Sequence, residues 1–308
     1  MLHDRHARGM ADNPDAVNRG SSALHRIARG CHVRMDAADD LAACCAAVLA
    51  SSADHTAVVA TTAARLHGLW LPPGMDDVHI ATMTPGVAGR SMTRTKRPQF
   101  RTHRWNIAAG QTTVVRGVRV TTPARTWRDL AAYLDLPALV AAGDSVLRGG
   151  TSIDELTQTV RHAGRGRNIR AVRTALALLD KRSRSRPESH LRVAVSAPDL
   201  PRFRVNEPVS RRNGGWLAEP DLSLPEARLA LEYQGLDHAD PDRMRRDLTR
   251  MADLRAEGWL VLPYGPAEVF SRPWEITGEV RAAIGQRAPH LFKPADMRRP
   301  ANLDRVAT

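Results

Sequence analysis

The sequence predicts an α/β protein of two domains, in which an α+β domain precedes a domain with a mixed sheet flanked by helices. Its length of 308 residues is enough for two domains that each bury their own core. Residues 181–186, KRSRSR, are charged and small, which is typical of an exposed linker. After this stretch the apolar pattern runs helix, three antiparallel strands, helix, strand, helix.

This division gives five segments. Residues 1–25 contain few large apolar groups, which predicts a disordered leader. An α+β domain is expected over residues 26–180, a linker over 181–186, and the sheet-and-helix domain over 187–287. Residues 288–308 form a tail without an interpretable pattern.

The first domain alternates helical and strand patterns. Residues 36–50 begin with acidic groups and continue with small apolar residues, as a helix does. Residues 55–70 predict a short strand followed by a helix that ends at Gly68. The stretches DDVHIAT, RTHRW and RGVRVTT predict a small sheet. A helix opened by Pro123 and closed by the glycines at 149–150, then another over 153–180, complete the domain.

The second domain opens with a helix in PESHLRVAVSA, which has Pro187 in its first turn. Two strands surround Asn213-Gly214, a dipeptide typical of a hairpin turn, and RLALEYQG forms the third strand. An amphipathic helix over PDRMRRDLTRMADLRAEG, a buried strand in WLVLPYG and a helix over residues 274–286 follow.

Composition narrows the possible partners. The net charge is +12 and the basic residues are mostly arginines, which bind phosphate well, so nucleic acid is the first partner to consider. An arginine-rich composition without any binding role is the alternative. No apolar run approaches the ~20 residues of a membrane helix, which favours a cytoplasmic protein without a membrane partner. Three cysteines, two of them adjacent, have the spacing of neither a disulfide framework nor a zinc site.

Polar side chains gather on one face of the predicted hairpin. Because side chains alternate along a strand, Asp221, Glu232 and Gln234 should lie together opposite the apolar side chains of both strands. Magnesium takes oxygen ligands and often only one or two carboxylates, so this pattern suits a metal site. A solvated polar face of an antiparallel sheet is the alternative.

The residues around this pair resemble a known family. Glu188, Asp221, the sequence EYQG, His238 and RMRRDLTRMADLRAEGWLVLPYG resemble the PD-(D/E)XK nuclease superfamily, and within it the domain akin to very-short-patch-repair endonucleases. The resemblance spans residues 186–270 and implies a restriction-endonuclease-like fold. It implies Mg²⁺ (or Mn²⁺) held by Asp221, Glu232 and the main-chain carbonyl of Tyr233, with Glu188 acting through water.

Other site residues follow from the same resemblance. Gln234 stands where many members have lysine, and a neutral amide would position water without supplying charge. His238 would act as the base for the attacking water or as a hydrogen-bond donor to a phosphate, and an exposed loop histidine without a role is the alternative. On the next helix, Arg243, Arg246 and Arg250 share one face, which would hold a DNA backbone or simply face solvent.

The first domain resembles a second family. TTAARLHGLWLPP, VHIAT, THRW and GVRVTTPARTWRDLAAYL are similar to the AbiEi-type antitoxin-like proteins, whose better-studied members bind DNA. Arg97, Arg101 and Arg104 belong to a basic cluster that would contact phosphate or form a solvated loop.

Together these patterns predict metal-dependent hydrolysis of DNA phosphodiesters, in a toxin–antitoxin, repair or phage-defence setting. The alternative is a non-catalytic DNA-binding antitoxin-like regulator that keeps the nuclease fold. A toxin protein is a further expected partner, and the sequence leaves the oligomeric state open.

Overall fold

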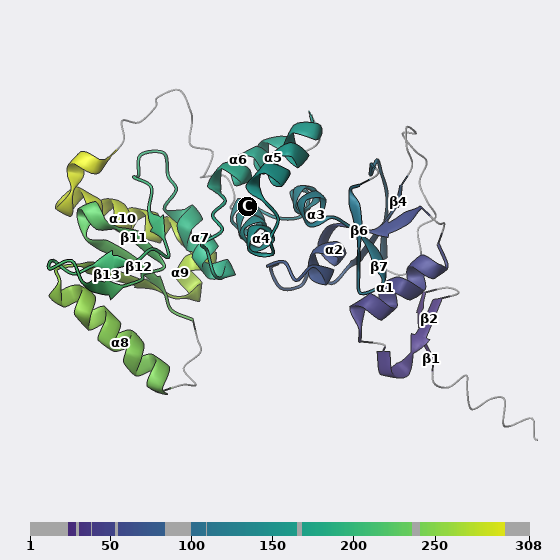
Figure 1. Cartoon of the computed structure of the whole chain (residues 1–308), viewed down its shortest axis with the longest axis horizontal. Helices are drawn as coiled ribbons and strands as arrows, with labels where there is room; N and C mark the ends of the chain where they lie inside the picture. The colour runs from purple at the N-terminus through teal and green to yellow at the C-terminus, as the bar shows by residue number, and fades with distance from the viewer. Residues whose placement is uncertain are drawn as a thin grey trace, which may run out of the picture. The chain divides into compact units, whose positions relative to one another are not determined.

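The chain forms two compact units in a computed structural model, which describes residues 24–28, 31–37, 39–52, 55–83, 100–108, 110–164, 168–235 and 241–292 (Figure 1). The first unit contains the chain up to Leu66 and Asp76–Thr122, and the second contains His67–Met75 and the chain from Pro123 onward. Both units combine helices with mixed sheets, so the predicted α/β class is confirmed at this level. No helix in the described residues is long and apolar enough to span a membrane.

A five-stranded sheet organises the first unit. Its order is β5-β4-β3-β7-β6, and its strands are β3 (Thr56–Val58), β4 (Val78–Met83), β5 (Phe100–Trp105), β6 (Thr112–Val115) and β7 (Val118–Thr121). Strands β3 and β7 run parallel, as do β4 and β5, whereas β3–β4 and β6–β7 are antiparallel. The three strands predicted from DDVHIAT, RTHRW and RGVRVTT are present, the short strand or turn expected in residues 55–70 is β3, and β6 is an additional strand.

Two helices and a hairpin complete this unit. They are α1 (Leu41–Ala50), α2 (Ala60–Leu66) and the pair β1 (Leu24–Ala28) and β2 (Cys31–Arg34), with a 3₁₀ turn at Met35–Ala37. The side chain of Asp40 accepts from the backbone N–H of Ala42 and so caps α1. Because β1 begins at Leu24, the end of the predicted leader is structured, and residues 1–23 lie outside the described residues.

Four helices open the second unit: α3 (Pro123–Leu130), α4 (Leu136–Arg148), α5 (Ile153–His162) and α6 (Ile169–Leu178). The single helix predicted after Pro123 is therefore wrong. It divides because Asp135 caps a new helix by accepting from the backbone N–H of Ala138. The expected helix over 153–180 likewise divides into α5 and α6.

A four-stranded sheet follows, with the order β13-β12-β11-β8. Its elements are α7 (Arg186–Ala194), β8 (Arg204–Val205), β11 (Leu222–Leu224), the 3₁₀ turn Pro225–Ala227, β12 (Leu229–Tyr233), α8 (Pro241–Ala256) and β13 (Leu260–Tyr264). Strands β8, β11 and β12 are antiparallel neighbours, and β13 joins β12 in parallel. A separate hairpin, β9 (Val209–Ser210) and β10 (Trp216–Ala218), interrupts the two long strands expected from sequence. Helices α9 (Pro266–Ser271) and α10 (Pro273–Arg287) and a 3₁₀ turn at Pro289–Leu291 end the described chain.

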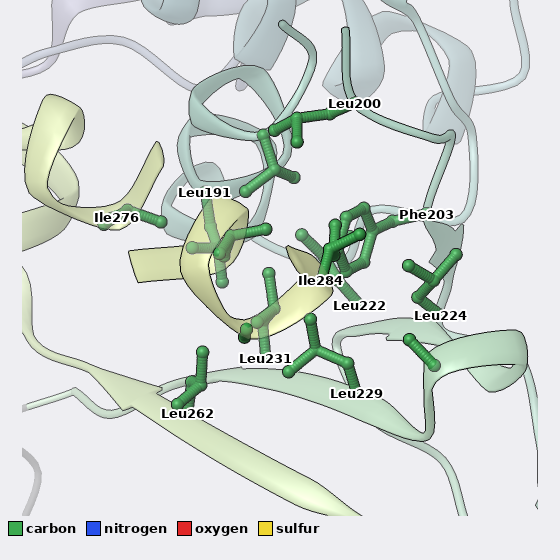
Figure 2. Close-up of a cluster of buried hydrophobic side chains, with 14 of the residues drawn as sticks. Leu191, Leu200, Phe203, Leu222, Leu224, Leu229, Leu231, Leu262, Ile276 and Ile284 are labelled. Atoms are coloured by element: carbon green, nitrogen blue, oxygen red, sulfur yellow. The ribbon is translucent and has the colours of Figure 1, made fainter. Parts of the chain in front are cut away.

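Helices cover both faces of this sheet (Figure 1). Leu222, Leu229 and Leu231 pack with Leu191 of α7 and Ile284 of α10 in one core, which Figure 2 shows. On the other face Ala230 and Val261 pack with Met251 and Leu254 of α8. The predicted alternation is right, and the alternative of a solvated polar face is wrong, because α8 packs against that face.

The predicted linker lies inside the second unit, and a buried polar network explains the difference. Asp144 of α4 is fully buried and pairs with the guanidinium of Arg192 on α7. It also accepts from Ser189 Oγ at 2.6 Å and from the backbone N–H of Asp180 at 2.8 Å. Ser183, in the middle of KRSRSR, is itself fully buried. Helices α4 and α7 therefore belong to one compact unit.

Replacing Asp144 tests this network. Asp144→Ala should lower the free energy of unfolding by about 3 to 5 kcal/mol, because Arg192 would stay buried without a counter-ion. Asp199→Ala is the control: its pair with Arg281 is exposed, at 30% and 46%, so its loss should cost less than about 1 kcal/mol. Urea unfolding followed by tryptophan fluorescence measures both, and equal small losses would contradict the network's role.

Candidate functional site

Three polar residues form a row across the second unit's sheet. Leu222 pairs with Leu231 and with Val205, and continuing these registers places Asp221 opposite both Glu232 and Asn206. The backbone N–H of Asn206 donates to the carbonyl of Asp221 at 3.0 Å. The two predicted carboxylates therefore meet at adjacent strand ends, as the sequence indicated.

Asp221 is fixed by the neighbouring strand. Its Oδ2 accepts from the backbone N–H of Tyr233 at 2.8 Å. Burial, followed by repulsion from Glu188, raises the pKa of Asp221, and the Tyr233 hydrogen bond and the charge of Arg250 only partly oppose this. The Asp221 carboxylate is thus held in place, but its negative charge is only partly balanced by nearby positive groups.

Glu232 lies deeper, at 2% exposure, on the face beneath α8. Its Oε2 lies 3.2 Å from a terminal nitrogen of Arg250, and its buried Oε1 has no hydrogen-bond partner among the described residues. Burial and then the charge of Asp221 raise the pKa of Glu232. A divalent cation would offset the repulsion between Glu232 and Asp221 and would give Oε1 a partner.

Glu188 is held by donors near the start of α7. Its carboxylate accepts from the backbone N–H of Arg184 and from Ser185 Oγ, both at 2.8 Å, and from Asn206 Nδ2 at 2.7 Å. These donors are neutral, and Glu188 has no salt bridge among the described residues.

Asn206 connects these acidic residues and was missed in the sequence. It is 8% exposed, adopts a left-handed backbone conformation with φ of 45°, and donates its side-chain amide to Glu188 and to the carbonyl of Arg182. An asparagine between Val205 and Glu207 gives no pattern from which this contact could be predicted. Asparagine is one of the few residues that accept this conformation readily, which explains its use here.

Gln234 does not face the carboxylates through its amide group. Its backbone N–H donates to the carbonyl of Tyr264 at 2.8 Å, and its side-chain nitrogen lies 3.8 Å from the sulfur of Met251. The charged group that contacts Glu232 is instead Arg250, which also lies 3.3 Å from Asp247. His238 falls outside the described residues.

The arginines predicted to bind DNA have separate surroundings. Arg250 turns toward Glu232, with 32% of its side chain exposed. Arg243 and Arg246 belong to α8, but their side chains lie outside the described part of the structure. In the first unit Arg101 pairs with Asp77 at 2.9 Å, Arg104 is exposed on β5, and Arg97 is not among the described residues.

Metal ligation at this site would depend on a pair of carboxylates. Within the described ranges no three His, Cys, Asp or Glu side chains form a group with metal-binding spacing, so Glu188 is not part of a three-carboxylate cluster. Asp221 and Glu232 are oxygen ligands of the type that magnesium and manganese take, and Glu232 has a free oxygen. The donor set fits a hard cation that completes its coordination with water.

Comparisons with known proteins give one family match, to a segment that ends before Asp221 and Glu232. Residues 56–181 match the family described as AbiEi antitoxin C-terminal domain, which confirms that resemblance for this region. The chain is also similar to uncharacterized proteins from two strains of Mycobacterium tuberculosis, with 32% identity over 168 residues. These residues are 54% of this chain and 62% of each relative, so the chain spans less than two thirds of their length. No solved structure gives a significant match.

Removing the charge of Glu232 should stabilise the protein in the absence of metal. In chelator at about pH 8, Glu232→Gln should raise the free energy of unfolding by about 1 to 2 kcal/mol, because it removes a buried charge beside Asp221. The pKa of Glu232 is raised in the folded protein, so wild-type stability falls as the pH rises. The stability gained by Glu232→Gln should therefore become smaller toward about pH 5, where Glu232 of the wild type is already protonated.

Glu226→Gln is the matched control for this change. Glu226 forms an exposed pair with Arg204, at 48% for both side chains, so its replacement should change stability by less than about 1 kcal/mol. Thermal unfolding at the two pH values measures both variants. A destabilised Glu232→Gln at the higher pH would show that the Arg250 pair outweighs the repulsion.

Two substitutions at Asn206 separate conformation from hydrogen bonding. Asn206→Gly keeps the left-handed backbone and should cost about 1 to 2 kcal/mol through the lost amide contacts. Asn206→Asp replaces a donor with a carboxylate facing Glu188, so it should be the more destabilising at about pH 8. The difference in free energy of unfolding between the two variants should become smaller at about pH 4. Urea unfolding measures it, and an equal loss of stability for both variants at both pH values would contradict the Glu188 contact.

Proposed function

We propose that the second unit hydrolyses DNA phosphodiesters with Mg²⁺ or Mn²⁺, in a protein that works in a toxin–antitoxin or phage-defence setting. The observation that carries this proposal is the Asp221–Glu232 pair. Two carboxylates that repel each other, Glu232 buried with an unpartnered oxygen and Asp221 half-buried beside it, destabilise the fold unless a cation joins them. Such costly placement is typical of functional sites.

The arrangement of elements around the pair supports the proposal. The order α7, β8, β11, β12, α8, β13, with three antiparallel strands and a parallel fourth, agrees with the restriction-endonuclease-like fold implied by the sequence resemblance. Asp221 precedes β11 and Glu232 lies near the end of β12, which are the positions where that resemblance places the metal ligands.

Each residue has a proposed part. Asp221 and Glu232 would hold the ion, with the carbonyl of Tyr233 as a third ligand and Glu188 acting through water. When bound, a divalent ion polarises a phosphoryl oxygen and lowers the pKa of a bound water. His238 would accept or donate a proton, and Gln234 would position water after turning away from Met251.

Arg250 would supply the positive charge that Gln234 lacks. Its guanidinium contacts Glu232, and its charge lowers the pKa of both carboxyl groups. A bound ion would compete for Glu232 and leave the guanidinium free for a phosphate oxygen, which arginine binds well.

A non-catalytic DNA-binding regulator is the second candidate. The AbiEi antitoxin match over residues 56–181 favours it, because it concerns a regulatory family and no hydrolase. The Arg250–Glu232 pair also suits it, since a permanent internal cation would replace the metal ion. In this case the sheet and its helices would serve to bind DNA or a toxin protein.

Plasmid nicking separates the two candidates. With Mn²⁺ the wild-type protein should nick supercoiled plasmid, and Asp221→Asn and Glu232→Gln should each slow nicking at least about 100-fold through loss of metal ligands. Glu226→Gln should nick like wild type. Equal nicking by all four proteins would indicate a contaminant and contradict the site, whereas DNA retention without nicking would favour the regulator.

A further inference from the structure

Four arginines from distant parts of the chain meet at the C-terminal end of α8, on the side where β13 begins. Arg211 and Arg212 come from the β9–β10 turn, Arg228 precedes β12, and Arg287 ends α10. Nitrogens of Arg212 and Arg228 lie 3.4 and 3.6 Å from the position that a Cβ on Gly258 would occupy. Arg287 donates to the carbonyl of Gly258 at 2.6 Å.

Helix capping explains part of this cluster. Arg228 donates to the carbonyl of Glu257, and Arg287 donates to those of Ala227 and Gly258, which satisfies carbonyls at the end of α8 and in a nearby turn. These partners are neutral, however, so the charges of both arginines remain. Arg228 also holds a left-handed backbone with φ of 45°, a conformation that costs free energy for a residue of this type.

The cluster carries more positive charge than capping requires. Arg211 pairs with Asp253 at 3.1 Å and lies 3.8 Å from Glu257, and these are the acidic side chains that the described residues place against it. The side chain of Arg212 is exposed and pairs with no acidic side chain among the described residues, although its backbone N–H donates to Glu257 Oε2 at 3.2 Å. Neighbouring guanidinium groups repel each other, and a phosphate oxygen between them would offset that repulsion.

An exposed tryptophan lies on the same hairpin. Trp216 pairs with Ser210 across β9–β10 and is 66% exposed, while its neighbour Leu217 is buried against α8. The backbone N–H of Arg211 donates to the carbonyl of Gly215, which keeps the turn beside Trp216 closed. An exposed aromatic ring on the hairpin that carries Arg211 and Arg212 suits an unpaired base, because the base could stack on the ring while its phosphate meets arginine.

We propose that Trp216 with Arg211, Arg212, Arg228 and Arg287 forms a surface that binds single-stranded DNA. The surface lies at the start of β12 and Glu232 near its end, so it is distinct from the carboxylate pair. It would hold an unpaired DNA strand while the carboxylates act on another part of the same DNA molecule. The choice of DNA over other polyanions rests on the proposed function, but binding itself requires no metal.

Binding of fluorescent oligodeoxythymidylate, measured by anisotropy in EDTA, tests this surface. Trp216→Ala should weaken binding about ten-fold through the lost base stacking. Arg212→Gln should reduce the slope of log affinity against log salt by about 0.7, as expected for one phosphate contact to a single strand. Duplex DNA of the same length should bind more weakly and be less sensitive to Trp216→Ala.

The chain provides matched controls. Trp274 is 65% exposed on α10, and Arg202 is 77% exposed beside Asp180, so Trp274→Ala and Arg202→Gln make equal chemical changes elsewhere in the same unit. Both should bind like wild type. Thermal unfolding of each variant identifies any effect that comes from misfolding.

Each outcome has a separate meaning. If the test and control variants weaken binding equally, or if wild type binds no oligonucleotide at low salt, the surface is wrong. If the surface is wrong but the protein still nicks plasmid with manganese, the proposed carboxylate site is unaffected. Retained binding by Asp221→Asn alongside lost nicking would show that the two sites act independently.

Discussion

The burial of Glu232 beneath α8, with the half-buried Asp221 beside it, is the constraint on which the second unit depends. Register alone places Asp221 opposite Glu232, but their effect on one another arises because α8 closes that face of the sheet with Met251 and Leu254. In a solvated face the two charges would be screened and their pKa values would stay ordinary. Hydrophobic packing around Ala230 and Val261 therefore excludes water and strengthens the repulsion between the two carboxylates, which makes the pair suitable for a cation.

The pair is held in a frame that extends well beyond the sheet. Asn206 joins the carbonyl of Asp221 to the carboxylate of Glu188, and the residue after Glu188, Ser189, donates to Asp144 of α4. Asp144 lies within the region that matches the AbiEi antitoxin C-terminal domain. Helix α7 thus has buried polar contacts on both sides. A change in the position of the family-matched helix α4 would shift α7 and with it Glu188.

Much of this could be predicted from the sequence because it depends on local pattern. Alternation along β11 and β12 places Asp221 and Glu232 correctly, and the apolar spacing of α8 predicts its buried stripe. The covering of the polar face could not be predicted, since alternation does not say which layer packs against a face. The role of KRSRSR was misread because its composition is that of a linker, whereas its buried Ser183 and the contacts of Arg182 with Glu207 and Asn206 depend on distant partners.

Long-range contacts also explain which site residues were missed. Asn206 acts through its backbone conformation and two distant acceptors, neither of which leaves a sequence pattern. Arg250 was assigned to a DNA-facing surface because helical spacing groups it with other arginines, but its contact with Glu232 depends on how α8 crosses the sheet. Three arginines, Arg212, Arg228 and Arg287, converge on Gly258 from segments that lie up to about 75 residues apart in the chain.

Isothermal titration calorimetry of the metal-free protein with Mn²⁺ tests the central claim most directly, because it needs neither substrate nor turnover. The account predicts a saturable binding event in wild type that is lost in Asp221→Asn and persists in Glu226→Gln. No binding heat in wild type, confirmed by an unchanged melting temperature on adding Mn²⁺, would contradict the claim that the buried carboxylates are a cation site.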